Sequence, residues 1–226
     1  MTFMLSYLKR GDNFIDAGAN VGMYTLLASS IVGKDGGVDA VEPCQKTLER
    51  LHENLQLNKI KQVRVHDAAV GEVDGIVRFL SDRDVTNRIY VDIDGNEPTI
   101  EVRCVRLDTV IQNRAYSMGK MDLEGGEFLA LKGCVNNLRI ANPPVWLLEV
   151  TDKISDYGFT QDELADWLEL HGYDMAIFDG KTGQLHFGRQ LWLRKRNVLA
   201  IARSAQDQVR KRLRSRNAVK SEKEQG

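Results

Sequence analysis

The sequence has only three cysteines, Cys44, Cys104 and Cys134, and they lie far apart. Their odd number and the absence of a Cys-x-x-Cys pair argue against a disulfide framework and against a zinc knuckle. No apolar run approaches the roughly 18 residues that a membrane-spanning helix needs. The first ten residues also lack the basic and then apolar order of a signal peptide. We therefore expect core or half-buried thiols, no membrane span and a cytoplasmic location.

Neither the length nor the composition indicates an unusual class of protein. The 226 residues are 42% hydrophobic and 28% charged, which excludes bulk disorder and fibrous structures. From Arg189 onward there are 12 Lys or Arg against 3 Asp or Glu, which leaves 19 against 29, a charge of −10, for residues 1–188. We predict one domain over residues 1–203 and a basic, frayed or partly helical C-terminal tail over residues 204–226.

Short apolar runs alternate with segments of helical periodicity along most of the chain. Seven strands are predicted, over residues 14–17, 38–41, 63–66, 120–123, 145–150, 175–178 and 198–202. Helices are predicted between them, over residues 23–31, 48–55, 107–111 and 160–171. Short connections imply right-handed crossovers. The pattern therefore predicts an α/β fold with a seven-stranded, mostly parallel sheet and helices on both faces.

The stretch between Val70 and Val105 has a different period. Apolar residues alternate there with Asp, Arg and Gly turn residues, and they are Ile76, Phe79, Ile89, Val91, Ile100 and Val102. A period of two is typical of half-buried strands in hairpins. We predict a β-hairpin insertion between the third and fourth core strands.

A glycine-rich turn joins the first predicted strand to the first predicted helix. Such a turn brings backbone N–H groups and a helix start close to a ligand. Gly18 and Gly22 permit this approach, and Asn20, which follows Ala19, tolerates a positive φ better than most residues. Sites for NAD, FAD and S-adenosylmethionine (SAM) share this loop, so the loop alone does not identify the cofactor.

Asp16, two residues before the first glycine, distinguishes these cofactors. NAD or FAD would place a doubly charged pyrophosphate over this turn, and a nearby carboxylate would oppose its binding. SAM has no phosphate and carries a cationic ammonium and a sulfonium, which the carboxylate can serve directly or through water. Charge complementarity therefore favours SAM.

Two further strand ends complete the expected cofactor site. Glu42 ends the second strand 24 residues after Gly18, where an acidic side chain can accept both hydroxyls of an adenosine ribose. Asp67 and Ala68, at the end of the third strand, would border the adenine, and Asp67 could accept from its exocyclic amine. Two alternatives stay open: a neighbour could replace Asp67, and Glu42 could be only a solvated strand-end carboxylate.

Ordered motifs extend beyond the loop, from about Gly11 to Val150. They are Phe14-Ile15-Asp16-Ala17-Gly18-Ala19-Asn20-Val21-Gly22, Val41-Glu42-Pro43, Asn54-Leu55-Gln56-Leu57-Asn58, Arg106-Leu107-Asp108-Thr109 and Met121-Asp122-Leu123-Glu124-Gly125-Gly126-Glu127 with Leu131-Lys132-Gly133. In these motifs the chain resembles the FkbM family of SAM-dependent methyltransferases. The resemblance implies a Rossmann-like class I SAM methyltransferase fold and O-methylation of sugars, glycoconjugates or hydroxylated natural products.

Two features depart from the family pattern. Members usually carry more sequence before the first strand, so we expect any N-terminal substrate-binding segment to be short or missing. Gly126 stands where the family often has alanine, which is a small change.

Methyl transfer to a hydroxyl requires an aligned acceptor and a route for the hydroxyl proton. Asp122 ends the fourth strand beside the first, so we expect it at the reacting end, as an orienting group or general base. Glu149 ends the fifth strand at the same rim, and Glu124 follows in the turn, so both are further catalytic candidates. Glu124 and Glu127 could instead stabilise a helix N-terminus. The trio Asp122, Glu124 and Glu149 could also hold magnesium or calcium, although we favour a site without a metal.

The basic tail supports an alternative function, that of a nucleic-acid (RNA) methyltransferase. Its cations could neutralise phosphates, but the acidic body would repel a polyanion from the cleft. A small-molecule or glycan acceptor is therefore favoured. A non-catalytic SAM-fold binding protein is a second alternative, and an NAD-dependent oxidoreductase is disfavoured by Asp16.

Overall fold

The computed structural model describes residues 1–80, 88–90 and 99–223. Its strands are β1 (Asn13–Ala17), β2 (Gly37–Glu42), β3 (Val63–Asp67), β4 (Ala69–Val70), β5 (Gly75–Leu80), β6 (Arg88–Ile89), β7 (Thr99–Val105), β8 (Met118–Met121), β9 (Val145–Glu149), β10 (Tyr173–Asp179), β11 (Gln184–Phe187) and β12 (Asn197–Ala202). Its α-helices are α1 (Thr2–Tyr7), α2 (Met23–Val32), α3 (Gln45–Leu57), α4 (Leu107–Ile111), α5 (Glu127–Lys132), α6 (Val135–Arg139), α7 (Gln161–Leu170) and α8 (Gln206–Lys223). Short 3-10 helices cover Gly33–Asp35, Asp152–Tyr157, Leu191–Leu193 and Arg203–Ala205.

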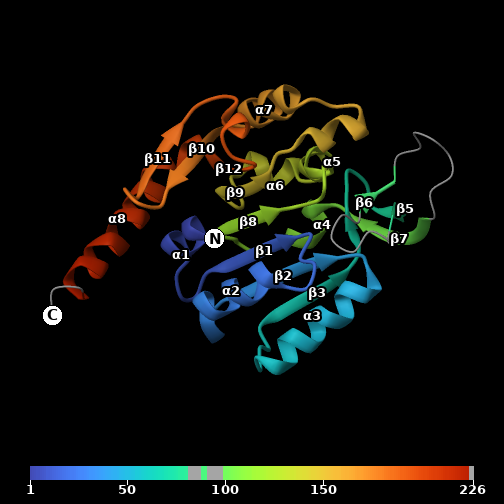
Figure 1. Ribbon diagram of the computed structural model, residues 1–226, viewed down its shortest axis with the longest axis horizontal. Coiled ribbons are helices and arrows are strands. Elements are labelled where there is room, and N and C mark those ends of the chain that lie inside the picture. The colour runs from blue at the N-terminus through green and yellow to red at the C-terminus, as the bar shows by residue number, and fades with distance from the viewer. Residues whose placement is uncertain (81–87, 91–98, 224–226) are drawn as a thin grey trace.

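The main sheet has eight strands in the order β11-β10-β12-β9-β8-β1-β2-β3 (Figure 1). The five strands β3, β2, β1, β8 and β9 run parallel, and β12, β10 and β11 each pair antiparallel with their neighbours in the order. The predicted count of seven strands was wrong by one, because β11 was not predicted. This strand has four residues and is partly exposed, which is too short for a hydrophobic period to be read. The mostly parallel α/β architecture is as predicted.

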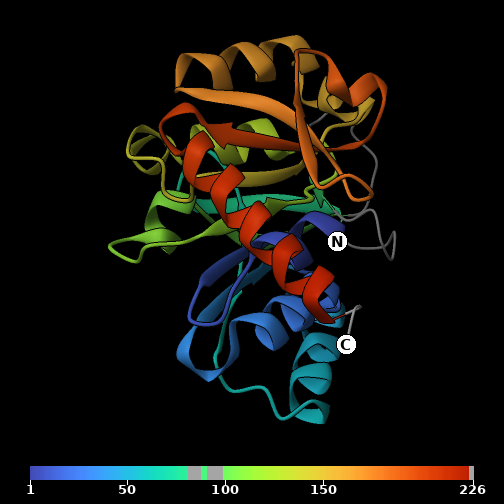
Figure 2. The same ribbon diagram turned by 90° about the vertical axis from the view of Figure 1, so that its left-hand side faces the viewer.

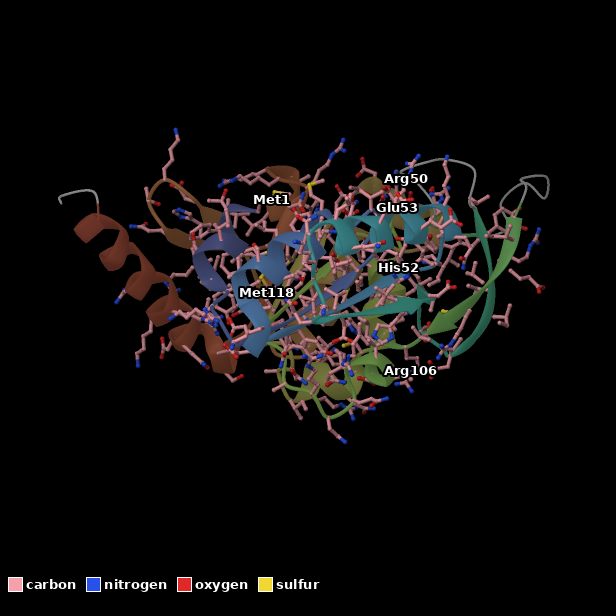
Figure 3. All side chains as sticks on the ribbon, turned by 90° about the horizontal axis from the view of Figure 1, so that it is seen from below. Met1, Arg50, His52, Glu53, Arg106 and Met118 are labelled. Carbon is pink, nitrogen blue, oxygen red and sulfur yellow. The ribbon has the colours of Figure 1, made fainter. Side chains whose placement is uncertain are left out.

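Helices cover both faces of this sheet. Figure 3 shows α3, with Arg50, His52 and Glu53, on one side of the strands and Arg106, at the start of α4, on the other. Helix α3 is amphipathic: Leu48, Leu51 and Leu55 are buried, as their spacing predicted. The carboxyl ends of the parallel strands therefore remain the accessible edge between the two helical layers.

The predicted β-rich insertion is a separate sheet beside this edge. Its strands follow the order β4-β7-β5-β6, with β5 antiparallel to both β6 and β7 (Figure 1). Val91, which contributed to the prediction, lies outside the described residues. The insertion thus lies where it can cover one side of a site at the strand ends.

Most of the segment predicted as a basic tail forms helix α8, which crosses one side of the molecule (Figure 2). Helix α8 packs against α1, and its residues Val209 and Leu213 are buried in the main hydrophobic core. Arg212 forms an ion pair with Asp12, just before β1. The three cysteine thiols are buried and free. Within the described residues, no helix has the length and apolar character needed to cross a membrane.

Candidate active site

A cavity of about 380 Å³ opens at the carboxyl ends of β1, β2, β8 and β9. Eight of the predicted site residues line it: Gly18, Ala19, Asn20, Glu42, Ala68, Asp122, Glu124 and Glu149. Gly22, Asp16 and Asp67 are not among its lining residues. Segments more than a hundred residues apart in the sequence thus meet in one cavity.

The β1–α2 turn has the backbone conformation that its sequence predicted. Gly18, Asn20 and Gly22 have φ values of 79°, 50° and 93°. Asn20 stabilises its own left-handed conformation, because its Oδ1 accepts a hydrogen bond from the Val21 N–H at 2.7 Å. Gly22 lies against α3, where an added Cβ would come within 2.4 Å of Leu51 Cδ1. Its role is therefore helix packing.

Glu42 connects the ends of β1 and β2. Its Oε2 accepts from the Asn20 N–H at 2.9 Å, and its Oε1 accepts from the Cys44 N–H at 3.0 Å and from Thr47 Oγ1 at 2.8 Å. The residue is buried, and this burial raises the pKa of its carboxyl. Among the described residues Oε2 accepts from a single donor, and Glu42 lines the cavity, so this oxygen retains capacity to accept from a ligand hydroxyl.

Asp16, which was expected to serve the cofactor directly or through water, lies behind the cavity wall. Its side chain is fully buried because β1 is a central strand, and Oδ2 accepts from Thr25 Oγ1 at 2.7 Å. Its Oδ1 has no hydrogen-bond partner among the described residues and lies 3.9 Å from Lys120 Nζ. Burial raises the pKa of Asp16, and Lys120 opposes this shift. The carboxylate therefore affects the charge of the cavity wall through its ion pair with Lys120.

Lys120 was missed by the sequence analysis. It lies in β8, its side chain is 4% exposed, and it lines the cavity. Nζ donates to Asp122 Oδ2 at 3.1 Å and lies 4.6 Å from the centre of the Tyr24 ring. Burial lowers the pKa of Lys120, but the charges of Asp16 and Asp122 outweigh it and raise the pKa. The signal in the sequence was a lysine inside an otherwise uncharged strand.

Three carboxylates meet at this end of the cavity. One oxygen each of Asp122, Glu124 and Glu149 lies within 4.8 Å of the others. Burial, together with a hydrogen bond to Asp122 and the negative charge of Asp122, raises the pKa of Glu149 to about 7. Lys120 pairs with Asp122, and Lys153 pairs with Glu124. The cluster is thus partly neutralised by the protein itself, and Glu149 is the member without a basic partner in the described residues.

Two predicted acidic residues have other surroundings. Asp67 is exposed, and its Oδ2 accepts from Gln45 Nε2 at 2.6 Å. Ala68, the next residue, lines the cavity together with Ala69 and Val70. Glu127 is buried, and its Oε1 accepts from the Leu123 N–H at 2.7 Å, which fixes the turn after β8. Burial raises the pKa of Glu127 to about 7.

The insertion supplies a wall that the sequence did not predict. Phe79, Arg88 and Ile89 line the cavity from β5 and β6. Tyr157, from the 3-10 helix after β9, donates its hydroxyl to the Ile89 carbonyl at 3.0 Å. Arg88 forms an ion pair with Asp156 of the same 3-10 helix. No local pattern in the sequence links these two segments, so only the folded chain reveals the wall.

A second cavity of about 550 Å³ adjoins the first, and Glu124 and Glu149 line both. Its other walls include the apolar Trp192 and Leu193 and the polar Gln161. A ligand in this second cavity can therefore also reach these two carboxylates.

Comparison with known proteins agrees with this geometry. The family model of the methyltransferase FkbM domain matches residues 16–175. The chain is similar in structure to methyltransferase FkbM from Methylobacillus flagellatus KT, with a TM-score of 0.55 and 20% identity over 84% of this chain and 43% of that one. The chain thus spans less than half of that relative.

Weaker structural similarities also exist. A SAM-dependent O-methyltransferase from Thermotoga maritima has a TM-score of 0.47 and 13% identity over 88% of this chain and 62% of its own. A putative rRNA methylase from Clostridium thermocellum has a TM-score of 0.48 and 14% identity over 88% and 89%. No curated protein matches the chain. The sheet is that of the Rossmann-like class I methyltransferases, and the extent of the family match shows that the chain belongs to the methyltransferase FkbM family.

Proposed function

We propose that this protein is a SAM-dependent O-methyltransferase that acts on a hydroxyl of a sugar, glycoconjugate or hydroxylated natural product. The observation that carries the proposal is one continuous cavity with Glu42 and the Asn20 turn at one part of its rim and Asp122 and Glu149 at another. An adenosine ribose would bind at the first, and a reacting hydroxyl would meet the second. The sugar or natural-product acceptor follows from the family resemblance.

The charges of the cavity support SAM as the cofactor. The carboxylates of Asp122, Glu124 and Glu149 would repel a pyrophosphate, but they favour a cationic ammonium and sulfonium. Glu42 Oε2 would accept from the ribose, and Ala68 would border the adenine. Asp16, whose Oδ1 lies 3.9 Å from Lys120 Nζ, adds negative potential below this end of the cavity.

SAM supplies an activated methyl group on its sulfonium when it is bound. What the protein must add is alignment of the acceptor and removal of the hydroxyl proton. Glu149, whose pKa is raised to about 7, would accept that proton as the C–O bond forms. Asp122, held by Lys120, would orient the hydroxyl through its remaining oxygen. The second cavity would hold the rest of the acceptor, with its apolar face against Trp192 and Leu193 and its polar groups near Gln161.

Isothermal titration with S-adenosylhomocysteine tests the cofactor assignment. We expect about micromolar binding by the wild type, at least about tenfold weaker binding by Glu42→Ala, and unchanged binding by Glu53→Ala, a control on the exposed face of α3. Thermal melting of each variant checks that it is folded. No binding by the folded wild type would overturn the proposal.

Transfer of a radiolabelled methyl group from SAM then tests the acceptor class. Sugars, glycoconjugates and hydroxylated natural products are expected to accept it, and total RNA is expected to remain unlabelled. Labelling of RNA alone would support the alternative function and overturn the proposed acceptor.

A further inference from the structure

Lys120 has more hydrogen-bonding capacity than its surroundings use. An ammonium group has three N–H donors. Within the described part of the chain, Nζ makes its hydrogen bond to Asp122, whereas Asp16 Oδ1 lies beyond hydrogen-bond distance at 3.9 Å. The side chain is 4% exposed, so bulk water does not readily supply the missing acceptors. A buried ammonium that faces a cavity with unused donors is suited to bind an anion.

The acidic end of the cavity creates a need for such a cation. The amino-acid end of SAM carries a carboxylate as well as an ammonium, and Asp122, Glu124 and Glu149 attract only the latter. Without a nearby positive charge, the ligand carboxylate would meet three like charges. A site that binds a zwitterion must therefore offer a positive and a negative group close together.

We propose that Lys120 binds the carboxylate of the amino-acid end of the cofactor, while Asp122 on its other side attracts the ammonium. This inference rests on the proposed SAM site. The ammonium of Lys120 lies between Asp122 and the buried Asp16, and the Tyr24 ring confines it on a third side. Its position is therefore fixed before a ligand arrives, which reduces the entropy lost on binding.

Arg88 is the other cation among the described residues that line the cavity, and it is less suited. It belongs to the insertion and is already paired with Asp156. Lys120, in contrast, lies in the central strand β8, which pairs with β1 directly below the Gly18 turn. The rigid strand thus places its charge beside the expected position of the amino acid.

Three nucleosides separate this role from a purely structural one. S-adenosylhomocysteine has the carboxylate, its decarboxylated analogue keeps only the ammonium, and 5′-methylthioadenosine lacks the amino acid. We would titrate each into the wild type, Lys120→Met and Lys181→Met, the last being a control lysine that is exposed in the turn between β10 and β11 and lines neither cavity.

We expect the wild type to bind S-adenosylhomocysteine about 10- to 100-fold more tightly than the decarboxylated analogue. Lys120→Met should lose most of this preference and bind 5′-methylthioadenosine as the wild type does. Lys181→Met should keep the preference. If Lys120→Met is poorly folded, the double variant Asp16→Asn/Lys120→Met takes its place, because it leaves no unpaired buried charge. The double variant should show the same loss of preference for S-adenosylhomocysteine.

Two outcomes would overturn the inference alone. One is a wild type that binds the first two ligands equally, and the other is a folded Lys120→Met variant that weakens all three ligands by the same factor. Failure of the wild type to bind any of the three would instead overturn the proposed SAM site, and the role of Lys120 with it.

Discussion

The Cα of Gly18 lies so close to Asp122 that a Cβ added to it would stand 2.0 Å from the Asp122 carbonyl oxygen. The Asp122 N–H also donates to the Ala17 carbonyl at 3.1 Å. The β1–α2 turn and the turn after β8 are therefore in direct backbone contact. This contact alone requires a glycine at position 18.

Replacement of Gly18 by alanine should separate the two turns. The positive φ of 79° and the overlap with Asp122 together should cost roughly 2–4 kcal/mol of unfolding free energy. Gly11 is a matched control, because its φ is 83° but a Cβ there would meet nothing within 4 Å. Gly11→Ala should cost only about 1 kcal/mol. Urea unfolding measures both, and equal losses would contradict the contact argument.

Methyl transfer should depend on pH through Glu149. A general base must be deprotonated, so the rate should fall as the pH decreases through about 7, the raised pKa of this group. Glu149→Gln should lower kcat by about 10²- to 10⁴-fold and remove this limb of the pH profile. The measurement is the initial rate with an identified acceptor between pH 5 and 9.

Asp122→Asn provides a second test of the same pair. Its negative charge contributes to the raised pKa of Glu149, so its removal should move the limb to lower pH. A profile that stays in place in this variant would show that the limb belongs to another group.

Glu127 should make the protein less stable at alkaline than at acidic pH. The pKa of this buried carboxyl is about 7 in the folded state and 4.5 unfolded, so the folded state binds more protons between these values. Stability from this group is complete below pH 4.5 and is lost as the pH rises through 7. Glu127→Gln should reduce the difference in unfolding free energy between pH 5 and pH 8, by roughly a few kcal/mol at most. The exposed Glu53→Gln should not change it.

Asp39 should have the opposite dependence. Burial raises its pKa, but hydrogen bonds from His66, Arg64 and Tyr116 outweigh burial and lower the pKa to about 2. The stability it contributes is complete above its unfolded pKa of 3.8 and is lost as the pH falls through about 2. Asp39→Ala should cost about 3–5 kcal/mol at pH 7, because the cations around it lose their partner.

Chemical denaturation at pH 7 checks the size of this loss. Asp35→Ala, which removes only an exposed pair with Arg10, should cost less than about 1 kcal/mol. Similar losses in the two variants would contradict the buried network.

The sequence predicted the elements whose signals are local. The end of β1, the positive φ of Asn20 and the apolar face of α3 depend on neighbours within a few residues, and the structure agrees with each. Glu42 and Asp122 were placed at the cavity because parallel strands end at a common edge. The placement of these two residues required only the order of strands and helices along the chain.

Contacts between distant segments were not predictable in this way. Asp16 and Lys120 are adjacent because β1 pairs with β8, and only this pairing shows that the carboxylate lies behind the lysine. Arg88 and Ile89 reach the cavity through the packing of the insertion on Tyr157. A single sequence contains no periodic signal for either relationship.

The position of β12 has a consequence for synthesis of the chain. The β10–β11 hairpin contacts the rest of the sheet through β12, which lies between β10 and β9 although it follows both in the sequence. A nascent chain that emerges from the ribosome can pair β1, β2, β3, β8 and β9 early, but the edge of β9 stays unpaired until residues 197–202 are available. An exposed strand edge favours aggregation. The emergence of residues 197–202 therefore determines when the edge of β9 can be covered within the chain.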